Sequence, residues 1–240
     1  MSLSPAYQTA LEQIAVDPEI FRRWPDYRVL AIVAENLFPP TEVSADGDEH
    51  PLAEVEATIR ARGAVDWPSE PHLAAWMRAY SEFGAKPKRT SPSALALVKR
   101  VEAGLPRIDP LTDLYNAVSV AHLLPIGGED LDAYQGSPRL TIATGDEPFD
   151  TVDTGEPVTD HPAAGEVIWR DDAGVTCRRW NWRQCVRTRI TADSRNVVFL
   201  LEALSPFEDA DLIAAGDELM TGLRAMSPQV ALGERLIAAP

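Results

Sequence analysis

The sequence predicts an α+β fold, in which a mixed or antiparallel sheet packs against helices and the N-terminus adds a helical extension. Helix-length amphipathic patterns dominate residues 52–124, strand patterns follow over 140–204, and one more helix comes after them. Residues 166–178 predict a β-hairpin, because two runs rich in β-branched and aromatic residues flank Asp171-Asp172-Ala173-Gly174. The continuous apolar run Asn196–Leu204 is typical of a strand buried on both faces.

The N-terminal part, residues 1–60, combines helix, strand and loop patterns. Residues 4–24 predict a helix with an interrupted middle, and Arg28–Ala34 predicts a strand. An acidic loop over 38–50 separates that strand from a helix at Leu52–Arg62, which Gly63 ends.

Three helices are expected next. The first is His72–Phe83, whose aromatic stripe predicts a core face. The second has Ser91 as N-cap and Pro92 at its first position, and it ends at Gly104. The third is Leu111–Leu124, and it is followed by a predicted loop at Pro125–Asp132.

The third of these helices carries an unusual polar stripe. Asp113, Asn116 and Ser119 recur at every third position of a strongly apolar segment, so they need partners if they are buried. Asn116 either brackets the neighbouring glycine loop or contributes to a pocket.

The remaining segments complete a single predicted domain over residues 1–240. Leu140–Ala143 and Glu166–Trp169 predict strands on either side of a Pro-, Asp- and Thr-rich surface segment. Residues 207–226 predict a C-terminal helix, with acids early and Arg224 late as the helix dipole favours.

Positive charge is concentrated in one segment of an acidic chain. The net charge is −15, which argues against a protein that coats DNA or RNA nonspecifically. Residues 178–195 nevertheless hold six arginines and one acid, and Lys86-Pro87-Lys88-Arg89 forms a second basic cluster. Such local patches suit a selective phosphate contact, or else pairing with the acidic segments of the same chain.

The segment at residues 178–183 concentrates aromatic and cationic side chains. Trp180 and Trp182 face the same way if the segment is extended, so they form either a stacking surface for a terminal adenine or a hydrophobic clasp. Arg178, Arg179 and Arg183 are phosphate candidates, as are Lys88 and Arg89.

Composition argues against several other classes of protein. The two cysteines, Cys177 and Cys185, are expected to be reduced thiols of a cytoplasmic protein, and no neighbouring base favours a thiol nucleophile. Scattered histidines and the lack of a Cys-x-x-Cys pair predict no metal site, and we expect no cofactor. No long apolar run predicts a membrane span.

Two stretches together carry a family resemblance. SPSALALVKRVEAGLPRIDPLTDLYNAVSVAHLLPIGGEDLDAY resembles the start of the B3/B4 domain in the β subunit of bacterial phenylalanyl-tRNA synthetase, with matches at Ser91-Pro92, Asp113, Asn116, Pro125 and Asp132. GEVIWRDD and RNVVFLLEALSP resemble the closing strands of that domain. The Leu-Pro-Ile-Gly loop and the Arg-Trp-Asn-Trp-Arg hairpin are most similar to freestanding B3/B4-domain proteins. The resemblance spans roughly residues 60 to 210 and implies a B3/B4-like core there.

The resemblance implies an activity. In the synthetase this domain hydrolyses tyrosine wrongly attached to the phenylalanine tRNA, which needs a positioned water, a donor for the oxyanion and an amino-acid pocket. It therefore implies binding of an aminoacyl-tRNA acceptor end and trans-editing by a deacylase. The alternative is a module that binds tRNA or a small amino-acid ligand without turnover.

The resemblance also implies roles for particular residues. Glu202 corresponds to the carboxylate that recognises the tyrosine hydroxyl, although a Glu at the end of a buried strand is equally the expected partner of an arginine such as Arg187. Gly127 and Gly128 lie where the synthetase has a catalytically implicated histidine, so their N–H groups and Asn116 become the candidates for the reacting centre. The implied ligand cleft contains Glu202, Trp180, Asn181 and Trp182.

Overall fold

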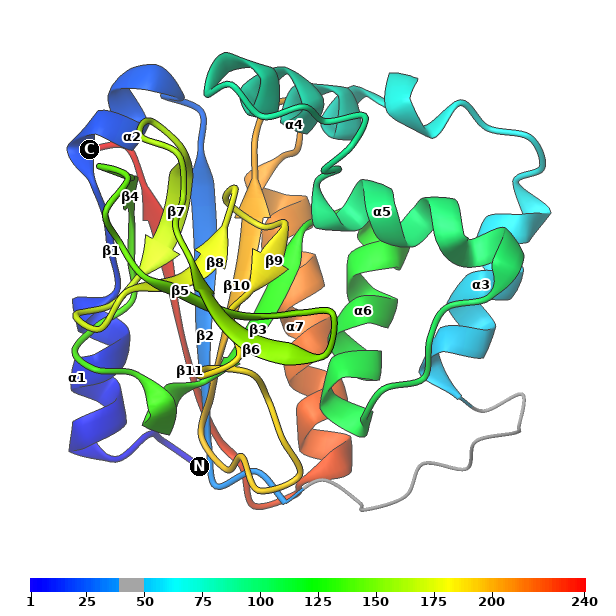
Figure 1. Cartoon of the computed structure of the whole chain (residues 1–240). Helices are drawn as coiled ribbons and strands as arrows, with labels where there is room; N and C mark the ends of the chain where they lie inside the picture. Colours follow the sequence, from blue (N-terminus) through cyan, green and yellow to red (C-terminus); the bar gives the residue numbers. More distant parts are fainter. Residues whose placement is uncertain (39–49) are drawn as a thin grey trace.

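The centre of the molecule is a four-stranded antiparallel sheet in the order β11-β2-β10-β3. A computed structural model describes residues 1–38 and 50–240, and the acidic loop predicted over 38–50 lies almost wholly outside the described residues. The strands of this sheet are β2 (Arg28–Glu35), β3 (Ile126–Asp130), β10 (Val197–Ala203) and β11 (Ala231–Ala238). Segments from both ends of the chain thus lie side by side (Figure 1).

Both faces of this sheet are covered, which explains the apolar runs in β2 and β10. Leu30 and Ile32 point to one face, where they pack with α6 (Pro110–His122) and α7 (Asp209–Met226). Val29 and Ala31 point to the other face, toward α1 (Pro5–Gln13) and α4 (Pro71–Glu82). The predicted strands at Arg28–Ala34 and Asn196–Leu204 are confirmed, and alternate side chains enter different cores.

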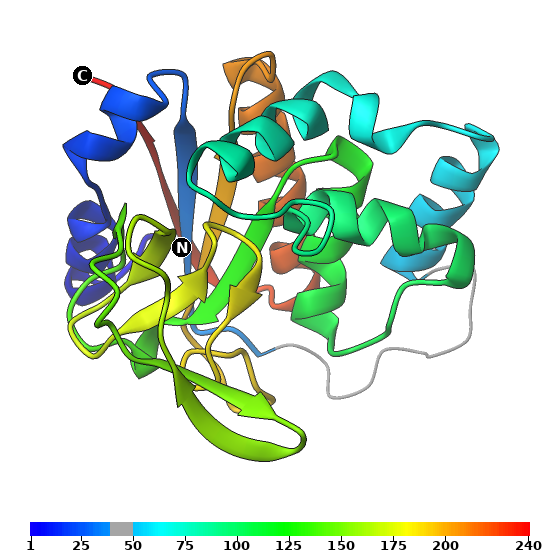
Figure 2. The same ribbon diagram turned by 45° about the horizontal axis from the view of Figure 1, so that its top comes forward.

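A second sheet lies across that other face in the order β1-β4-β7-β8-β9 (Figure 2). Its strands are β1 (Ala15–Val16), β4 (Arg139–Ile142), β7 (Val167–Arg170), β8 (Val175–Arg178) and β9 (Arg183–Gln184), and β1 pairs in parallel with β4. The predicted hairpin is confirmed, because β7 and β8 pair across the Asp171–Gly174 turn. The α+β class follows from these two sheets and their helices.

Four further elements frame the sheets. They are α2 (Pro18–Arg23), α3 (Pro51–Ala61), α5 (Ser93–Arg100) and the ribbon of β5 (Phe149–Asp153) with β6 (Glu156–Asp160). The ribbon occupies the segment predicted as irregular surface, and every residue of β6 is exposed. An exposed two-stranded ribbon gives little hydrophobic periodicity to find.

Several sequence expectations need correction. Residues 4–24 form two helices with β1 between them, because Asp17 caps a new helix at Pro18. Ser91 is not an N-cap: its hydroxyl donates to the Pro87 carbonyl, and α5 begins at Ser93. The predicted loop at Pro125–Asp132 contains strand β3, and β11 was not predicted because its exposed edge carries mixed charged and apolar residues.

Candidate functional site

A cavity of about 250 Å³ lies between the face of the central sheet, the β8–β9 turn and helices α5 and α6. Its floor is formed by β3 and β10, and its walls come from segments far apart in the chain. The lining residues are Ser93, Ala96, Leu97, Tyr115, Asn116, Ile126, Gly127, Glu129, Trp169, Cys177, Trp180, Asn181, Trp182, Arg183, Gln184, Leu200 and Glu202. The structure therefore brings together Glu202, Asn116 and Gly127, as the site hypothesis requires.

Glu202 lies at one end of the floor, bound by neutral donors rather than by an arginine. Its Oε1 accepts hydrogen bonds from the Tyr27 hydroxyl at 2.7 Å and the Trp169 indole at 3.0 Å, and its Oε2 accepts from Asn181 Nδ2 at 3.1 Å. Burial raises the pKa of Glu202 to about 7, while these donors act in the opposite direction. A carboxylate has about four acceptor positions, so Oε2 retains capacity for a further donor.

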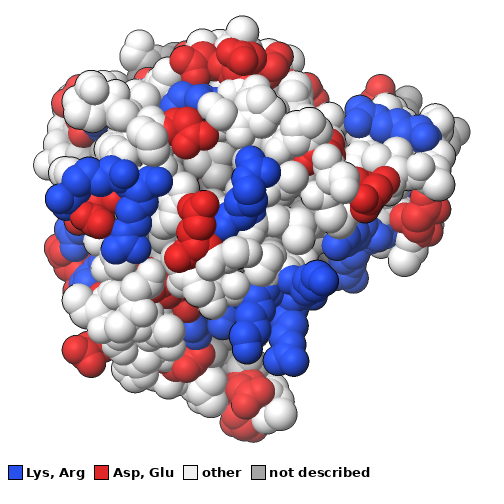
Figure 3. All heavy atoms as spheres, turned by 90° about the horizontal axis from the view of Figure 1, so that it is seen from above, with Lys and Arg blue, Asp and Glu red and all other residues white. Residues whose placement is uncertain are grey.

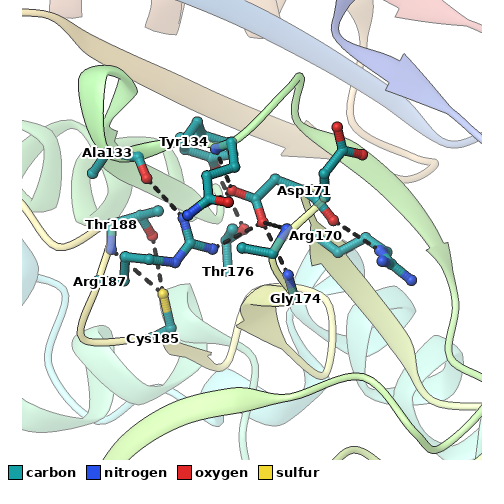
Figure 4. Close-up of polar contacts among 12 residues, drawn as sticks. Ala133, Tyr134, Arg170, Asp171, Gly174, Thr176, Cys185, Arg187 and Thr188 are labelled. Carbon is teal, nitrogen blue, oxygen red and sulfur yellow. Dashed lines mark hydrogen bonds and ion pairs between the residues drawn. The ribbon is translucent and has the colours of Figure 1, made fainter.

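Arg187, the expected alternative partner of Glu202, pairs elsewhere. Its guanidinium makes two 2.8 Å bonds to the fully buried Asp171 and a third bond to the Ala133 carbonyl (Figure 4). The two bonds lower the pKa of Asp171 against the effect of burial. This pair holds the β7–β8 turn, and Glu202 has no cationic partner among the residues that the structure describes.

The segment that carries Trp180 and Trp182 is not extended, because Arg179 and Trp180 both have positive φ. Trp180 has a φ of 67°, is completely buried and packs against Trp24, Tyr27 and Trp76, with ring centroids 4.8 to 5.1 Å apart. The hydrophobic clasp is therefore the interpretation that its packing supports. Trp182 is only half-buried, and the Arg179 guanidinium lies 4.2 Å from its ring centroid.

Asn181 links the turn to the rest of the site. Its Oδ1 accepts from the Tyr80 hydroxyl at 2.8 Å, which leaves Nδ2 directed at Glu202. Two other polar atoms of the lining, Ser93 Oγ and Trp180 Nε1, are buried without a hydrogen-bond partner among the described residues. The Trp180 indole lies close enough to Glu202 to lower the pKa of that carboxyl, so Ser93 Oγ is the unpartnered group that favours a ligand in this cavity.

The paired glycines occupy different environments. Just outside the two ends of β3, the Glu202 N–H donates to the Pro125 carbonyl and the Leu131 N–H donates to the Asn196 carbonyl. Because hydrogen-bonded pairs alternate along antiparallel strands, Gly127 and Leu200 also form a hydrogen-bonded pair. The Gly127 N–H is thus directed into the sheet, and this residue offers open space above the floor. Gly128 packs instead on the opposite face, where a Cβ would lie 2.9 to 3.0 Å from Ile190, Phe199 and Tyr115.

Asn116 reaches the cavity from α6 and is 8% exposed. Its side-chain amide makes no hydrogen bond with any residue that the structure describes, unlike the two other members of its stripe. Asp113 accepts from Ile108 N–H, and Ser119 donates to the Leu124 carbonyl. The amide of Asn116 is therefore free to bind a ligand.

The basic residues divide into structural and accessible ones. Arg178 is buried, makes two 2.9 Å bonds to Glu166 and also pairs with Asp160. Arg183, Lys88 and Arg89 are exposed. Figure 3 shows Lys and Arg side chains gathered in patches on the face seen from above, with Asp and Glu between them.

A second cavity, of about 310 Å³, joins the two basic clusters of the sequence. Lys86 and Arg89 line it from the turn after α4, and Arg179 lines it from the β8–β9 turn. Glu166 also contributes to its wall, but its carboxylate is already bound by Arg178. Since Arg179 also contacts Trp182, this cationic cavity adjoins the rim of the first one.

The cysteines are buried free thiols whose pKa burial raises. A raised pKa lowers the thiolate fraction, which agrees with the expectation that neither is a nucleophile. Among residues 1–38 and 50–240, no group of three or more His, Cys, Asp or Glu side chains is placed to hold a metal ion. In the same residues no helix is long and apolar enough to cross a membrane.

Sequence reasoning missed three of the polar groups around this cavity. Tyr27 was not singled out and Trp169 was assigned only to a strand, although the Tyr27 hydroxyl and the Trp169 indole N–H both donate to Glu202. Glu129 fell within the predicted loop at Pro125–Asp132, although strand β3 places it on the same face as Gly127. The local pattern Gly-Gly-Glu-Asp gives no signal of a strand.

Together, the two sheets and the cavity between them, which apolar and polar side chains line, define an α+β domain with one candidate site. The model of the B3/4 domain family matches residues 75–211, and the chain belongs to this family. A search of curated proteins finds no match.

Among solved structures, the chain is similar to an N-terminal fragment of the phenylalanyl-tRNA synthetase β-subunit from Pyrococcus horikoshii, with 14% identity and a TM-score of 0.46. The match covers 93% of this chain and 53% of the other, so the chain spans about half the length of that fragment.

Proposed function

We propose that this protein binds the acceptor end of an aminoacyl-tRNA and hydrolyses the ester of a wrongly attached amino acid. One observation carries the proposal: Glu202, Asn116 and Gly127, which come from separate parts of the chain, line a single cavity beside a cationic rim. Membership of the B3/4 domain family supports a function related to tRNA synthetases.

The amino-acid side chain would lie against Glu202. The cavity volume of about 250 Å³ falls just below the roughly 300–1,000 Å³ of sites for drug-sized ligands, which suits one amino acid. Glu202 Oε2 has unused acceptor capacity, so a hydroxyl or another donor on the side chain is the group it recognises best.

The ester would lie above Gly127, where the missing side chain allows close approach. Asn116 supplies a free amide that would donate to the developing oxyanion. The Gly128 N–H is the second candidate donor, because the register directs it away from β10. The Gly128 carbonyl points to the same side, where it accepts a 2.8 Å hydrogen bond from Gln184 Nε2. Catalysis of this kind depends on the positioning of a water rather than on a strong base.

The tRNA backbone would follow the cationic rim. Lys86, Arg89 and Arg179 share the second cavity, and the exposed Arg183 lines the first one. Lys88 is exposed beside them. Arg178 is left out of this contact, because Glu166 and Asp160 already bind its guanidinium.

Deacylation of a panel of mischarged aminoacyl-tRNAs tests the proposal. The rate of ester loss is measured with the wild-type protein, with Asn116→Ala and with Lys99→Ala, which removes an exposed lysine of α5 outside both cavities. We expect acceleration for at least one mischarged tRNA, a loss of roughly tenfold to a thousandfold in Asn116→Ala and no change in Lys99→Ala. No acceleration for any member of the panel contradicts the catalytic function.

A second candidate function is binding of aminoacyl-tRNA without turnover. It is favoured by the character of the cavity, where the one thiol, Cys177, has a raised pKa and the acids are held by neutral donors. The same panel distinguishes the two functions, since binding alone would protect the ester instead of shortening its lifetime.

A further inference from the structure

Glu129 is a second acidic residue on the floor of the cavity. It is the fourth of the five residues of β3, is 2% exposed, and shares the cavity-facing side of the strand with Gly127. A carboxylate in such a position has a high desolvation cost unless it is bound by a cation or by several donors. Glu129 therefore needs an explanation of its own.

Only neutral hydroxyl groups of the described residues bind the Glu129 carboxyl group. Thr188 Oγ1 donates to Oε2 at 2.8 Å, the Tyr134 hydroxyl donates to the same oxygen, and the Thr176 hydroxyl also acts on the carboxyl group. Neither oxygen has a lysine, arginine or histidine within ion-pair distance among the described residues, whereas the buried Asp171, Glu166 and Glu56 each pair with an arginine. Burial accordingly raises the pKa of Glu129.

The register fixes where Glu129 lies relative to Glu202. Glu129 is opposite Val198, so the two acids are separated by four residues along β10, roughly 13 Å between backbone positions. Gly127 and Leu200 lie between them on the same face. The floor thus has a carboxyl group at each end, and the indole rings of Trp169, Trp180 and Trp182 contribute to its walls.

We propose that Glu129 binds the α-ammonium group of the amino acid in this cavity, while Glu202 recognises the side chain at the opposite end. An ammonium group has three N–H donors and a positive charge, so it would give Glu129 the cationic partner that the protein does not supply among the described residues. Glu202 already has three donors, so it needs only one more. The ligand class is therefore an amino acid with a free α-amino group, esterified or amidated at its carboxyl group.

This inference rests on the proposed amino-acid site, and the test distinguishes a wrong role for Glu129 from a wrong assignment of the whole site. Calorimetry measures the binding of a panel of amino-acid amides to the full chain, and then compares the best amide with its des-amino counterpart. We expect the amide to bind at least tenfold more tightly than the des-amino compound. Equal affinities overturn the role of Glu129 and leave the amino-acid site intact, whereas no binding of any amide overturns both.

Variants then test whether Glu129 is the residue that causes the preference for the amide over the des-amino compound. Glu129→Gln keeps the shape but removes the charge, and we expect it to weaken amide binding tenfold to a hundredfold while des-amino binding changes less than twofold. Asp130→Asn, one residue along and bound by Ser194 and Asp132, is the control and should change neither. If Glu129→Gln retains the full preference for the amide, Glu129 does not bind the ammonium group. Thermal unfolding verifies that each variant is folded, and Glu129→Asp, which keeps the charge, should recover part of the preference.

Discussion

Asn181 Nδ2 donates a 3.1 Å hydrogen bond to Glu202 Oε2 and joins the β8–β9 turn to the central sheet. The orientation of the amide is fixed, because Tyr80 and Ser93 donate to its oxygen. The turn that carries the two tryptophans therefore sets the direction of the carboxylate that faces the cavity. Positions 181 and 202 form one unit of the site.

We expect Asn181→Asp to destabilise the fold by about 3 kcal/mol near pH 8, because it places a second carboxylate against buried Glu202. Protonation of one acid restores a hydrogen bond, so the loss should shrink near pH 5. Urea unfolding at the two pH values measures both effects. Asn196→Asp is the control: Asn196 donates to Asp132 at 2.7 Å on the exposed surface, where the same change should cost less than about 1 kcal/mol.

Glu202→Gln should change how stability depends on pH. The pKa of Glu202 is raised from 4.5 to about 7 in the fold, so its stabilising contribution is complete below pH 4.5 and is lost as pH rises through 7. The wild type should therefore lose about 3 kcal/mol relative to the variant between pH 4.5 and 7.5. Urea unfolding across this range tests it, and parallel curves for the two proteins would contradict the raised pKa.

His72 should give the opposite trend. Its ring accepts from the Trp76 indole and lies 3.1 Å from the Leu123 carbonyl, and burial lowers its pKa from 6.5 to about 4. A histidine held neutral stabilises the fold above pH 6.5, and this stability is lost as pH falls toward 4. We expect the stability of His72→Gln to fall less steeply than that of the wild type between pH 6.5 and 4. His122→Gln, which removes a half-buried histidine paired with Glu218, serves as the control.

The two glycines of β3 should respond differently to the same substitution. Gly127→Ala meets only Gln184 Nε2 at 3.6 Å, so the fold should keep its stability within about 0.5 kcal/mol while the cavity becomes smaller. Gly128→Ala places a methyl group 2.9 to 3.0 Å from Ile190, Phe199 and Tyr115 and should cost about 1–3 kcal/mol. Thermal unfolding of both variants makes the comparison, and equal losses would contradict the described packing.

Substitution of Arg178 should affect the stability of the fold, whereas substitution of Arg183 should affect RNA binding. Arg178→Ala leaves buried Glu166 without its main partner and should destabilise the fold by about 3–5 kcal/mol. Arg183→Ala removes an exposed cation, so the free energy of unfolding should be unchanged. The slope of the tRNA binding constant against salt concentration, on logarithmic axes, should fall by the amount expected for about one phosphate contact. Unfolding and fluorescence anisotropy at several salt concentrations measure these effects. An unchanged salt slope for Arg183→Ala would remove this residue from the proposed contact.

The sequence predicted the elements whose patterns are local. The β7–β8 hairpin and the doubly buried β10 were found because turn residues and apolar runs lie within a few positions. Strands β3 and β11 were missed, since glycines and mixed charges acquire a strand conformation there only through pairing with β10 and β2. Pairing between distant segments leaves no local signal.

The same limit applies to the site. The resemblance pointed to Glu202, Asn116 and Gly127, and the structure places these three on one cavity. It could not show that Arg178 is engaged in an ion pair with Glu166, or that Glu129 lines the same cavity. Those facts depend on which side of each strand faces inward, and the register that decides this joins residues about seventy positions apart.

The position of β2 between β10 and β11 has a consequence for the order of folding. These strands come from residues 28–35, 197–203 and 231–238, so the central sheet joins segments separated by most of the chain. Nucleation of such a sheet is slow because long loops must close first. During synthesis the residues of β2 leave the ribosome long before those of β10 and β11, so its apolar faces stay unpaired until these partner strands have been made.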